Sequence, residues 1–211
     1  MIKAIVLDIG GVVLRTEDKT GRRVLEQTYG LLPGGVDALV FKSQAAAEST
    51  LGKTSLENIW QHVANELSLS NDELIAFQRA FWQGDQIDQN LVQFLQTLRT
   101  RYTTAFLTNA WVNARDALET QYCIVEGETV DHLLISSELG VAKPDPKIYD
   151  ILSETINARF EQIIFVDDFI ENIEAASALG LHTIHYQPGM DLIAHIQNRL
   201  DQYESRLEEK P

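Results

Sequence analysis

The 211-residue sequence predicts an α/β protein in which helices cover both faces of a parallel β-sheet. Five short segments are rich in apolar residues and mostly lack polar alternation, which is typical of parallel strands buried on both faces. Helical patterns separate these segments along the chain. About ninety residues of helical character lie between the first two segments, far more than the ~2–6 residues of an ordinary connecting loop.

The predicted strands follow one another at irregular intervals along the chain. They are residues 2–7, 103–107, 133–136, 163–166 and 183–186. Each run is four to six residues long, within the usual range for a strand.

The long helical stretch after the first strand predicts an inserted subdomain. We place this helical cap at residues 16–88 and the core domain at residues 1–15 and 89–211. Within the insertion, Thr54 with Glu57 and Ser70 with Glu73 have the spacing of capping boxes, and each pair precedes an apolar helical stripe.

The later part of the chain carries further helix signals. Asp145 and Pro146 predict an N-cap and a first helical residue. Gly180 predicts the end of a helix over residues 171–179. A final helix has an apolar stripe that we expect to pack on the core, made of Ile193, Ile196, Leu200, Tyr203 and Leu207.

Composition limits the possible partners. Seventeen basic and 31 acidic residues give a net charge of −14, which disfavours binding to nucleic acid. No run approaches the ~20 apolar residues of a membrane span, and the N-terminal apolar run is too short for a signal peptide. The single cysteine, Cys123, excludes an internal disulfide and a cysteine zinc site. We therefore expect a cytoplasmic protein, and its oligomeric state cannot be predicted from the sequence.

Chemically active residue types follow several predicted strands, where open α/β sheets bind ligands. Asp8 ends the first strand and is followed by Gly10 and Gly11, which allow a sharp turn and close approach to a ligand. Asp8 is thus a candidate nucleophile or metal ligand, although an acid at this position could also only cap the turn.

Two further candidate segments carry groups that suit an anion. Thr108 and Asn109 follow the second strand, and a hydroxyl and an amide can hold an anionic oxygen or merely cap a loop. Trp111 comes next and could line a pocket or pack in the core. Lys143, before Pro144, could offset the charge of a phosphoryl group or could be a surface lysine in a turn.

The fourth segment is an acidic pair. Asp167 and Asp168 end the fourth strand and are followed by Asn172. Two adjacent carboxylates repel each other, and Mg²⁺ relieves such repulsion because it binds carboxylate oxygens. Asp168 could instead cap the next helix, an explanation that accounts for one of the two acids.

In this order and placement, the four segments resemble the motifs of the haloacid dehalogenase-like hydrolase superfamily. The resemblance covers essentially the whole chain, since the insertion resembles the helical cap of that superfamily. It implies a Rossmann-like core. A weaker resemblance, carried by the Asp8–Val13 segment, points to bacterial sugar-phosphate phosphatases.

The resemblance implies a Mg²⁺-dependent phosphatase for a small phosphorylated metabolite. Asp8 would be the nucleophile and form an aspartyl phosphate. Mg²⁺ would be held by the Asp8 carboxylate, the carbonyl of Gly10 and Asp168, with Asp167 binding through water or supporting the site from outside.

The same resemblance assigns the phosphoryl contacts. Thr108 and the main-chain N–H of Asn109 would bind phosphoryl oxygens. Lys143 would neutralise charge on the phosphoryl group and on Asp8. The cap would close over the site and exclude water.

One position departs from the family pattern. Phosphatases of this superfamily usually carry a second aspartate two residues after the nucleophile, as acid and base, and here that residue is Gly10. Such a group contributes about 10²–10⁴-fold in rate. Two alternatives stay open: a 2-haloacid dehalogenase-type hydrolase, in which the aspartate attacks carbon, and, because of Gly10, a non-catalytic relative that binds a phosphorylated ligand or a protein without turnover.

Overall fold

The computed structural model describes the backbone of residues 1–208 and the side chains of residues 1–205. Its main sheet has five parallel strands in the order β5-β4-β1-β6-β7. The strands are β1 (Ala4–Leu7), β4 (Thr103–Thr108), β5 (His132–Ile135), β6 (Ile163–Asp167) and β7 (His182–His185). The predicted α/β fold is confirmed, and each predicted strand is present within one or two residues of its expected ends.

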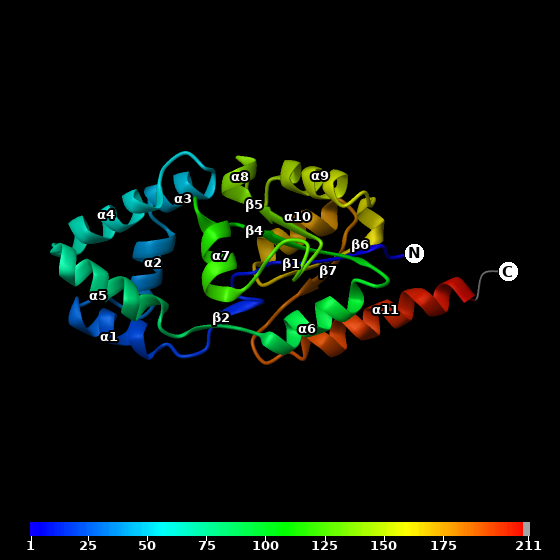
Figure 1. Cartoon of the computed structure of the whole chain (residues 1–211), viewed down its shortest axis with the longest axis horizontal. Helices are drawn as coiled ribbons and strands as arrows, with labels where there is room; N and C mark the ends of the chain where they lie inside the picture. Colours follow the sequence, from blue (N-terminus) through cyan, green and yellow to red (C-terminus); the bar gives the residue numbers. More distant parts are fainter. Residues whose placement is uncertain (209–211) are drawn as a thin grey trace.

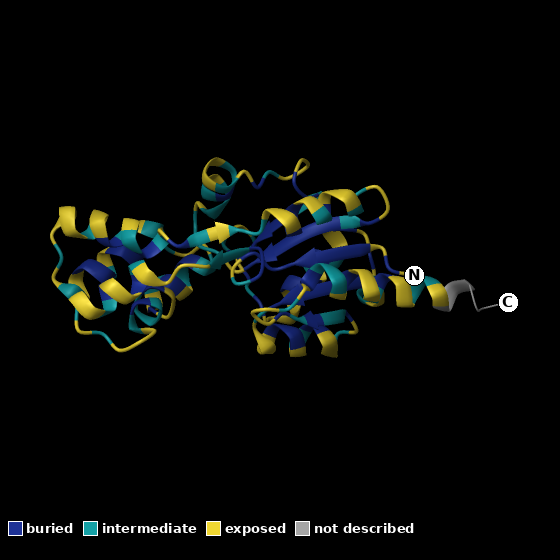
Figure 2. Ribbon diagram, turned by 90° about the horizontal axis from the view of Figure 1, so that it is seen from below, coloured by how far each residue is buried: buried dark blue, intermediate teal, exposed yellow. Residues whose placement is uncertain are grey.

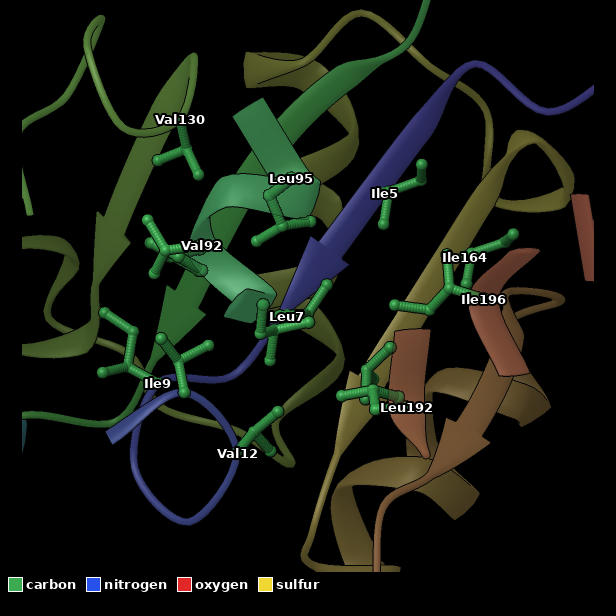
Figure 3. Packing of buried hydrophobic residues seen from close by; sticks show 14 of the residues in the cluster. Ile5, Leu7, Ile9, Val12, Val92, Leu95, Val130, Ile164, Leu192 and Ile196 are labelled. Carbon is green, nitrogen blue, oxygen red and sulfur yellow. The ribbon is translucent and has the colours of Figure 1, made fainter. Parts of the chain in front are cut away.

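Helices cover both faces of this sheet (Figure 1). One apolar core lies between the sheet and α6 (Gln89–Leu98), α7 (Ala114–Tyr122) and α11 (Leu192–Glu208). Figure 3 shows this packing, with Ile5 and Leu7 of β1 near Leu95 and Val92 of α6. The opposite face packs against α8 (Ser136–Leu139), α9 (Pro146–Thr155) and α10 (Ile170–Ala178).

The central strand explains why the apolar runs lack alternation. Ile5 and Leu7 belong to one core, whereas Ala4 and Val6 belong to the other, and all four are fully buried. A strand covered on both faces needs apolar residues at every position.

Five helices after β1 form a separate helical unit at one end of the molecule (Figures 1 and 2). They are α1 (Thr20–Thr28), α2 (Gly35–Phe41), α3 (Gln44–Thr50), α4 (Leu56–Leu67) and α5 (Asn71–Trp82). This unit, residues 20–82, has its own apolar core, which includes Val36, Ile59, Val63, Phe77 and Phe81.

Two short antiparallel strands connect the helical unit with the sheet domain. They are β2 (Leu14–Thr16) and β3 (Asp85–Ile87). This ribbon was not predicted from the sequence, because three-residue strands are too short to show a periodic pattern.

The helix-start predictions had mixed outcomes. Ser70 and Glu73 form the predicted capping box at α5. The predicted Thr54 box is wrong: α4 begins one residue later with Ser55 as its N-cap, and Thr54 instead accepts a hydrogen bond from Asn58. Thr54 and Ser55 both carry a hydroxyl group, so the sequence alone does not show which of them is the N-cap.

The helix signals of the later chain are confirmed. Asp145 caps α9 and accepts a hydrogen bond from the N–H of Lys147, and Pro146 is the first helical residue. Gly180 follows α10 with φ of +96°. The stripe of α11 packs on the core through Ile196 and Leu200, whereas the side chain of Leu207 lies outside the described residues.

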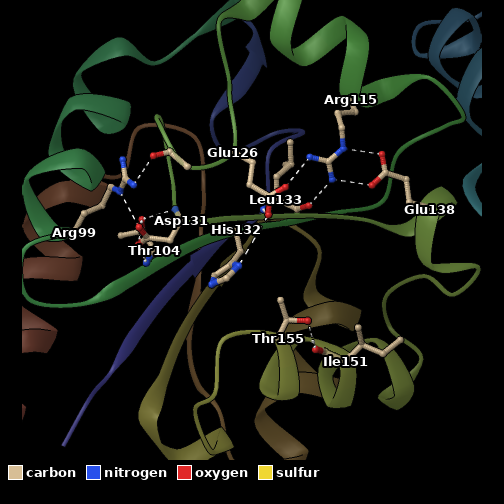
Figure 4. A network of polar contacts seen from close by, with 11 residues as sticks. Arg99, Thr104, Arg115, Glu126, Asp131, His132, Leu133, Glu138, Ile151 and Thr155 are labelled. Atoms are coloured by element: carbon tan, nitrogen blue, oxygen red, sulfur yellow. Dashed lines mark hydrogen bonds and ion pairs between the residues drawn. The ribbon is translucent and has the colours of Figure 1, made fainter.

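Two arginines anchor the loop between α7 and β5 (Figure 4). Arg115 pairs with Glu126 and Glu138, and Arg99 pairs with Asp131. These contacts lie beside the edge strand β5. Across residues 1–208, we find no helix that combines the length and the apolar character needed to cross a bilayer.

Candidate active site

The predicted site residues meet at the carboxyl edge of the sheet. Asp8 directly follows β1, Thr108 ends β4, Asp167 ends β6, and Asp168 is the next residue. Because β1 lies between β4 and β6, these residues come from three neighbouring strands. This is the edge at which open α/β sheets bind ligands.

Lys143 lies between two of the acids. Its Nζ lies 2.9 Å from Asp8 Oδ1 and 2.7 Å from Asp167 Oδ2, and it donates a hydrogen bond of 2.8 Å to the carbonyl of Leu107. The Lys143 side chain is 1% exposed. The alternative of a surface lysine in a turn is therefore wrong.

Asn109 holds the main chain of Lys143. Asn109 Nδ2 donates to the Lys143 carbonyl over 2.8 Å, and the Lys143 N–H donates to Asn109 Oδ1 over 2.9 Å. The side-chain amide is thus engaged with the chain itself, and not with a position for an anionic oxygen. Sequence spacing could not reveal this pairing, since 34 residues separate the two partners.

Both oxygens of Asp167 are engaged within the protein. Oδ1 accepts hydrogen bonds from the N–H of Phe169 and from Asn172 Nδ2, and Oδ2 accepts from Lys143. Asp167 is fully buried. Its geometry is that of a residue that orients Lys143.

Asp8 and Asp168 are less fully engaged within the protein than Asp167. Within residues 1–205, the buried side-chain oxygens without a hydrogen bond are Asp8 Oδ1 and Asp168 Oδ1, and of these Asp8 Oδ1 has the Lys143 ammonium as its ion-pair partner. One carboxylate oxygen from each of Asp8, Asp167 and Asp168 lies within 4.8 Å of the others. Hard oxygen donors at this spacing fit a divalent cation such as Mg²⁺.

The electrostatics of the cluster agree with this fit. Burial raises the pKa of Asp8, although Lys143 opposes the effect. Burial, together with the charges of Asp8 and Asp167, raises the pKa of Asp168 to about 6. Burial alone would lower the pKa of Lys143, but the two acids outweigh it and raise that pKa. A single ammonium therefore faces three carboxyl groups and leaves a negative excess that a cation would offset.

The two glycines after Asp8 differ in their surroundings. Gly11 has φ of +81°, and a Cβ there would lie 2.2 Å from Asp168 Oδ2, so a side chain would displace the acid. Gly10 is exposed, its φ is not positive, and a Cβ there would meet no atom within 4 Å. A carboxylate side chain at position 10 would therefore have room.

One neighbour of the acid cluster was not predicted. His185, at the end of β7, has its Nε2 3.0 Å from the carbonyl oxygen of Asp168. Only the pairing of β6 with β7 brings them together, since 17 residues separate them in the chain.

A cleft of about 1700 Å³ lies between the acid cluster and the helical unit. Its core side includes Asp8, Thr108, Lys143 and Asp168. Its other side is formed by residues of the helical unit, including the aromatic side chains of Phe41, Trp60 and Trp82. Trp111, after Thr108 and Asn109, also lines it, in agreement with one of its two predicted roles.

Known proteins resemble this chain over different lengths. The mouse bifunctional epoxide hydrolase 2 is 32% identical over 102 residues, which are 46% of this chain and 18% of that protein. The chain thus spans less than a fifth of that relative. D-ribitol-5-phosphate phosphatase from Bacteroides thetaiotaomicron is 26% identical over 218 residues, covering 90% of this chain and 95% of the relative.

A solved structure shares the fold. It is a haloacid dehalogenase family enzyme from Bacteroides thetaiotaomicron in complex with magnesium and inorganic phosphate. The TM-score is 0.71 at 18% identity, over 90% of this chain and 97% of the other. The family model described as haloacid dehalogenase-like hydrolase matches residues 2–180. The chain therefore belongs to the haloacid dehalogenase-like hydrolase family.

Proposed function

We propose that the chain is a Mg²⁺-dependent phosphatase that hydrolyses a small phosphorylated metabolite through an aspartyl phosphate on Asp8. The observation that carries this proposal is the set of three clustered carboxyl groups faced by one lysine, with a buried oxygen of Asp168 that has no partner in the protein. Relatives named as phosphatases support the reaction class.

The chain's own residues suit the covalent step. An Asp8 oxygen would attack phosphorus while the bond from phosphorus to the ester oxygen breaks, and the organic group leaves as an alkoxide or phenoxide that takes up a proton. Lys143, 2.9 Å from Asp8 Oδ1, would offset the negative charge that collects there. Water would then attack the aspartyl phosphate, releasing phosphate and restoring Asp8.

Asp8, the Gly10 carbonyl and Asp168 would hold Mg²⁺, with Asp167 contributing through water or by orienting its neighbours. When bound, Mg²⁺ would supply Lewis-acid stabilisation of the phosphoryl oxygens. Thr108 and the Asn109 N–H would bind the remaining phosphoryl oxygens, since both lie at the same edge of the sheet.

The helical unit would act as the cap, with residues 16–88 inserted between core segments 1–15 and 89–211. Its side of the cleft faces Asp8 and Lys143, which is the position a lid requires. A lid that closes over the site would exclude water while Asp8 attacks.

The carboxylate excess favours phosphoryl transfer over the dehalogenase alternative, because attack on a carbon–halogen bond does not need a divalent cation. The non-catalytic alternative is disfavoured because Asp8 and Lys143, which the covalent step needs, are both present and in contact. A sugar phosphate remains a candidate substrate, supported by the relative named D-ribitol-5-phosphate phosphatase.

One assay separates the three functions. A fluorogenic aryl phosphate is incubated with the protein in Mg²⁺ and in a chelator, and chloride release from 2-chloropropionate is measured in parallel. Hydrolysis of the phosphate that needs Mg²⁺ is the expected result. Metal-independent chloride release would support the dehalogenase, and the absence of both reactions in a protein that binds Mg²⁺ would support the non-catalytic alternative.

A further inference from the structure

The chain concentrates its tryptophans at one place. All three, Trp60, Trp82 and Trp111, line the cleft together with Phe41. They come from α4, the end of α5, the loop after β4 and the end of α2. Three elements of the helical unit and one loop of the core therefore contribute to a single aromatic cluster.

The rings of this aromatic cluster hold one another in place. Phe41 stacks on Trp111 with ring centroids 5.3 Å apart. Trp60 and Trp82 meet Trp111 edge-on, at 6.4 Å and 6.2 Å. These are favourable aromatic geometries, so the cluster is a preformed surface.

Part of this surface is exposed. Phe41 is 44% exposed, and Trp82 and Trp111 are partly exposed. Phe169, the residue after Asp168, also lines the cleft and is 60% exposed. Large apolar side chains that meet water on both sides of one cleft indicate a surface that a ligand covers.

Arg22, whose guanidinium lies over the ring of Phe41, is already paired. Arg22 contacts Asp37 and Asp85, and its guanidinium lies 4.3 Å from the ring centre of Phe81. Lys19, Lys42 and Thr50 also line this side of the cleft, so a polyhydroxylated ligand is the competing occupant, and the matched substrates below distinguish the two.

We infer that the cleft takes a phosphomonoester whose organic part is an apolar hydrocarbon chain, with its phosphate at Asp8 and its chain along the aromatic cluster. This inference rests on the proposed phosphatase function and specifies its substrate class. A chain is favoured over a flat ring because the one stacked pair, Phe41 and Trp111, is already in contact, and Trp60 and Trp82 meet Trp111 edge-on.

A series of n-alkyl phosphates from ethyl to octyl tests the inference. The basicity of the leaving alkoxide barely changes with chain length, so kcat/KM reports the contact of the chain. Each buried methylene should raise kcat/KM by about threefold to fourfold. Phe41→Ala and Trp111→Ala should flatten this slope, whereas Ile75→Ala should keep it, because Ile75 is 54% exposed in the same unit but does not line the cleft.

A matched pair of substrates distinguishes an apolar from a polyhydroxylated organic group. Hexyl phosphate and a hexitol 6-phosphate have equal carbon counts and differ in their hydroxyl groups. Preference for hexyl phosphate supports the inference. A flat chain-length series or preference for the hexitol phosphate would overturn it and leave the phosphatase function intact.

Binding measured without turnover separates the inferred apolar substrate site from the proposed phosphatase function. n-Alkylphosphonates cannot be hydrolysed at their carbon–phosphorus bond, and every tryptophan of the chain reports on the aromatic cluster. With Mg²⁺ present, tryptophan fluorescence should change with an affinity that rises with chain length. If affinity rises with chain length but the protein hydrolyses no phosphate, the phosphatase function is refuted and the apolar binding site is kept. If affinity does not depend on chain length, the apolar binding site is refuted.

Discussion

Asn109 and Lys143 form a reciprocal pair of hydrogen bonds, in which one side-chain amide both donates to and accepts from the main chain of the other residue. The same lysine then places its ammonium between Asp8 and Asp167. The position of the charge at the centre of the site therefore depends on an amide one residue beyond Thr108.

We predict that Asn109→Ala lowers activity by shifting Lys143. The variant loses two hydrogen bonds, each worth about 0.5–1.5 kcal/mol, so unfolding should become easier by about 1–3 kcal/mol. A small displacement of Lys143 should reduce kcat on an aryl phosphate by up to about 10²-fold. Asn90→Ala is the matched control, since Asn90 also lines the cleft, and it should keep both stability and kcat.

Asp8→Asn should abolish turnover while the protein stays folded. The amide is nearly isosteric but cannot attack phosphorus, and Lys143 keeps its contact with Asp167. Activity and circular dichroism are measured on the same preparation. Substantial residual hydrolysis by the folded variant would exclude the aspartyl phosphate.

Asp168→Asn should remove Mg²⁺ binding and stabilise the metal-free protein. Calorimetry should show Mg²⁺ binding to the wild type and little to the variant. In chelator at pH 8, the variant loses repulsion from Asp8 and Asp167. Solvent screening limits this gain to about 1 kcal/mol, or about 2–4 °C in Tm. Undiminished Mg²⁺ affinity in the variant would refute the metal assignment.

The affinity for Mg²⁺ should fall below pH 6. The pKa of Asp168 in the metal-free protein is raised to about 6, so protons compete with the cation below this pH. The apparent Kd should rise about tenfold per pH unit there and level off above it. The stability of the metal-free protein changes in the opposite direction with pH. Because the pKa of Asp168 is higher in the folded protein, this group favours the fold at low pH, and the contribution is lost as pH rises from about 4 through 6. Calorimetry across pH 5–8 measures the first effect, and thermal unfolding in chelator across pH 4–8 measures the second.

Gly10→Asp should change the dependence on the leaving group. Among substrates of similar apolar size, the wild type should favour leaving groups of low pKa, such as aryl phosphates, because position 10 carries no carboxylate. The variant should gain more on alkyl than on aryl phosphates, by up to the ~10²–10⁴-fold typical of a general acid.

The neighbouring glycine is the control for this substitution. The backbone and surroundings of Gly10 accept a side chain, whereas Gly11→Ala places a Cβ 2.2 Å from Asp168 Oδ2 and should weaken Mg²⁺ binding. The measurement is kcat/KM across leaving groups of graded pKa. A flat dependence in the wild type would mean that another residue supplies the proton.

The sequence by itself determined the sheet and the segments that form the site. Strands covered on both faces are apolar along their length, so residues 4–7 and 163–166 can be recognised from the local sequence pattern. Parallel strands also bring their carboxyl ends to one edge, which is why Asp8, Thr108 and Asp168 could be grouped in advance.

The tertiary structure decided the partners within that group. The pairing of Asn109 with Lys143, the contact of His185 with the Asp168 carbonyl and the assembly of the aromatic cluster join residues 17 or more positions apart. The three-residue strands β2 and β3 likewise form only by pairing across 69 or more positions. Such contacts produce no periodic pattern in the sequence. The residue types involved occur equally in loops, caps and cores, so only tertiary packing determines which residues contact one another.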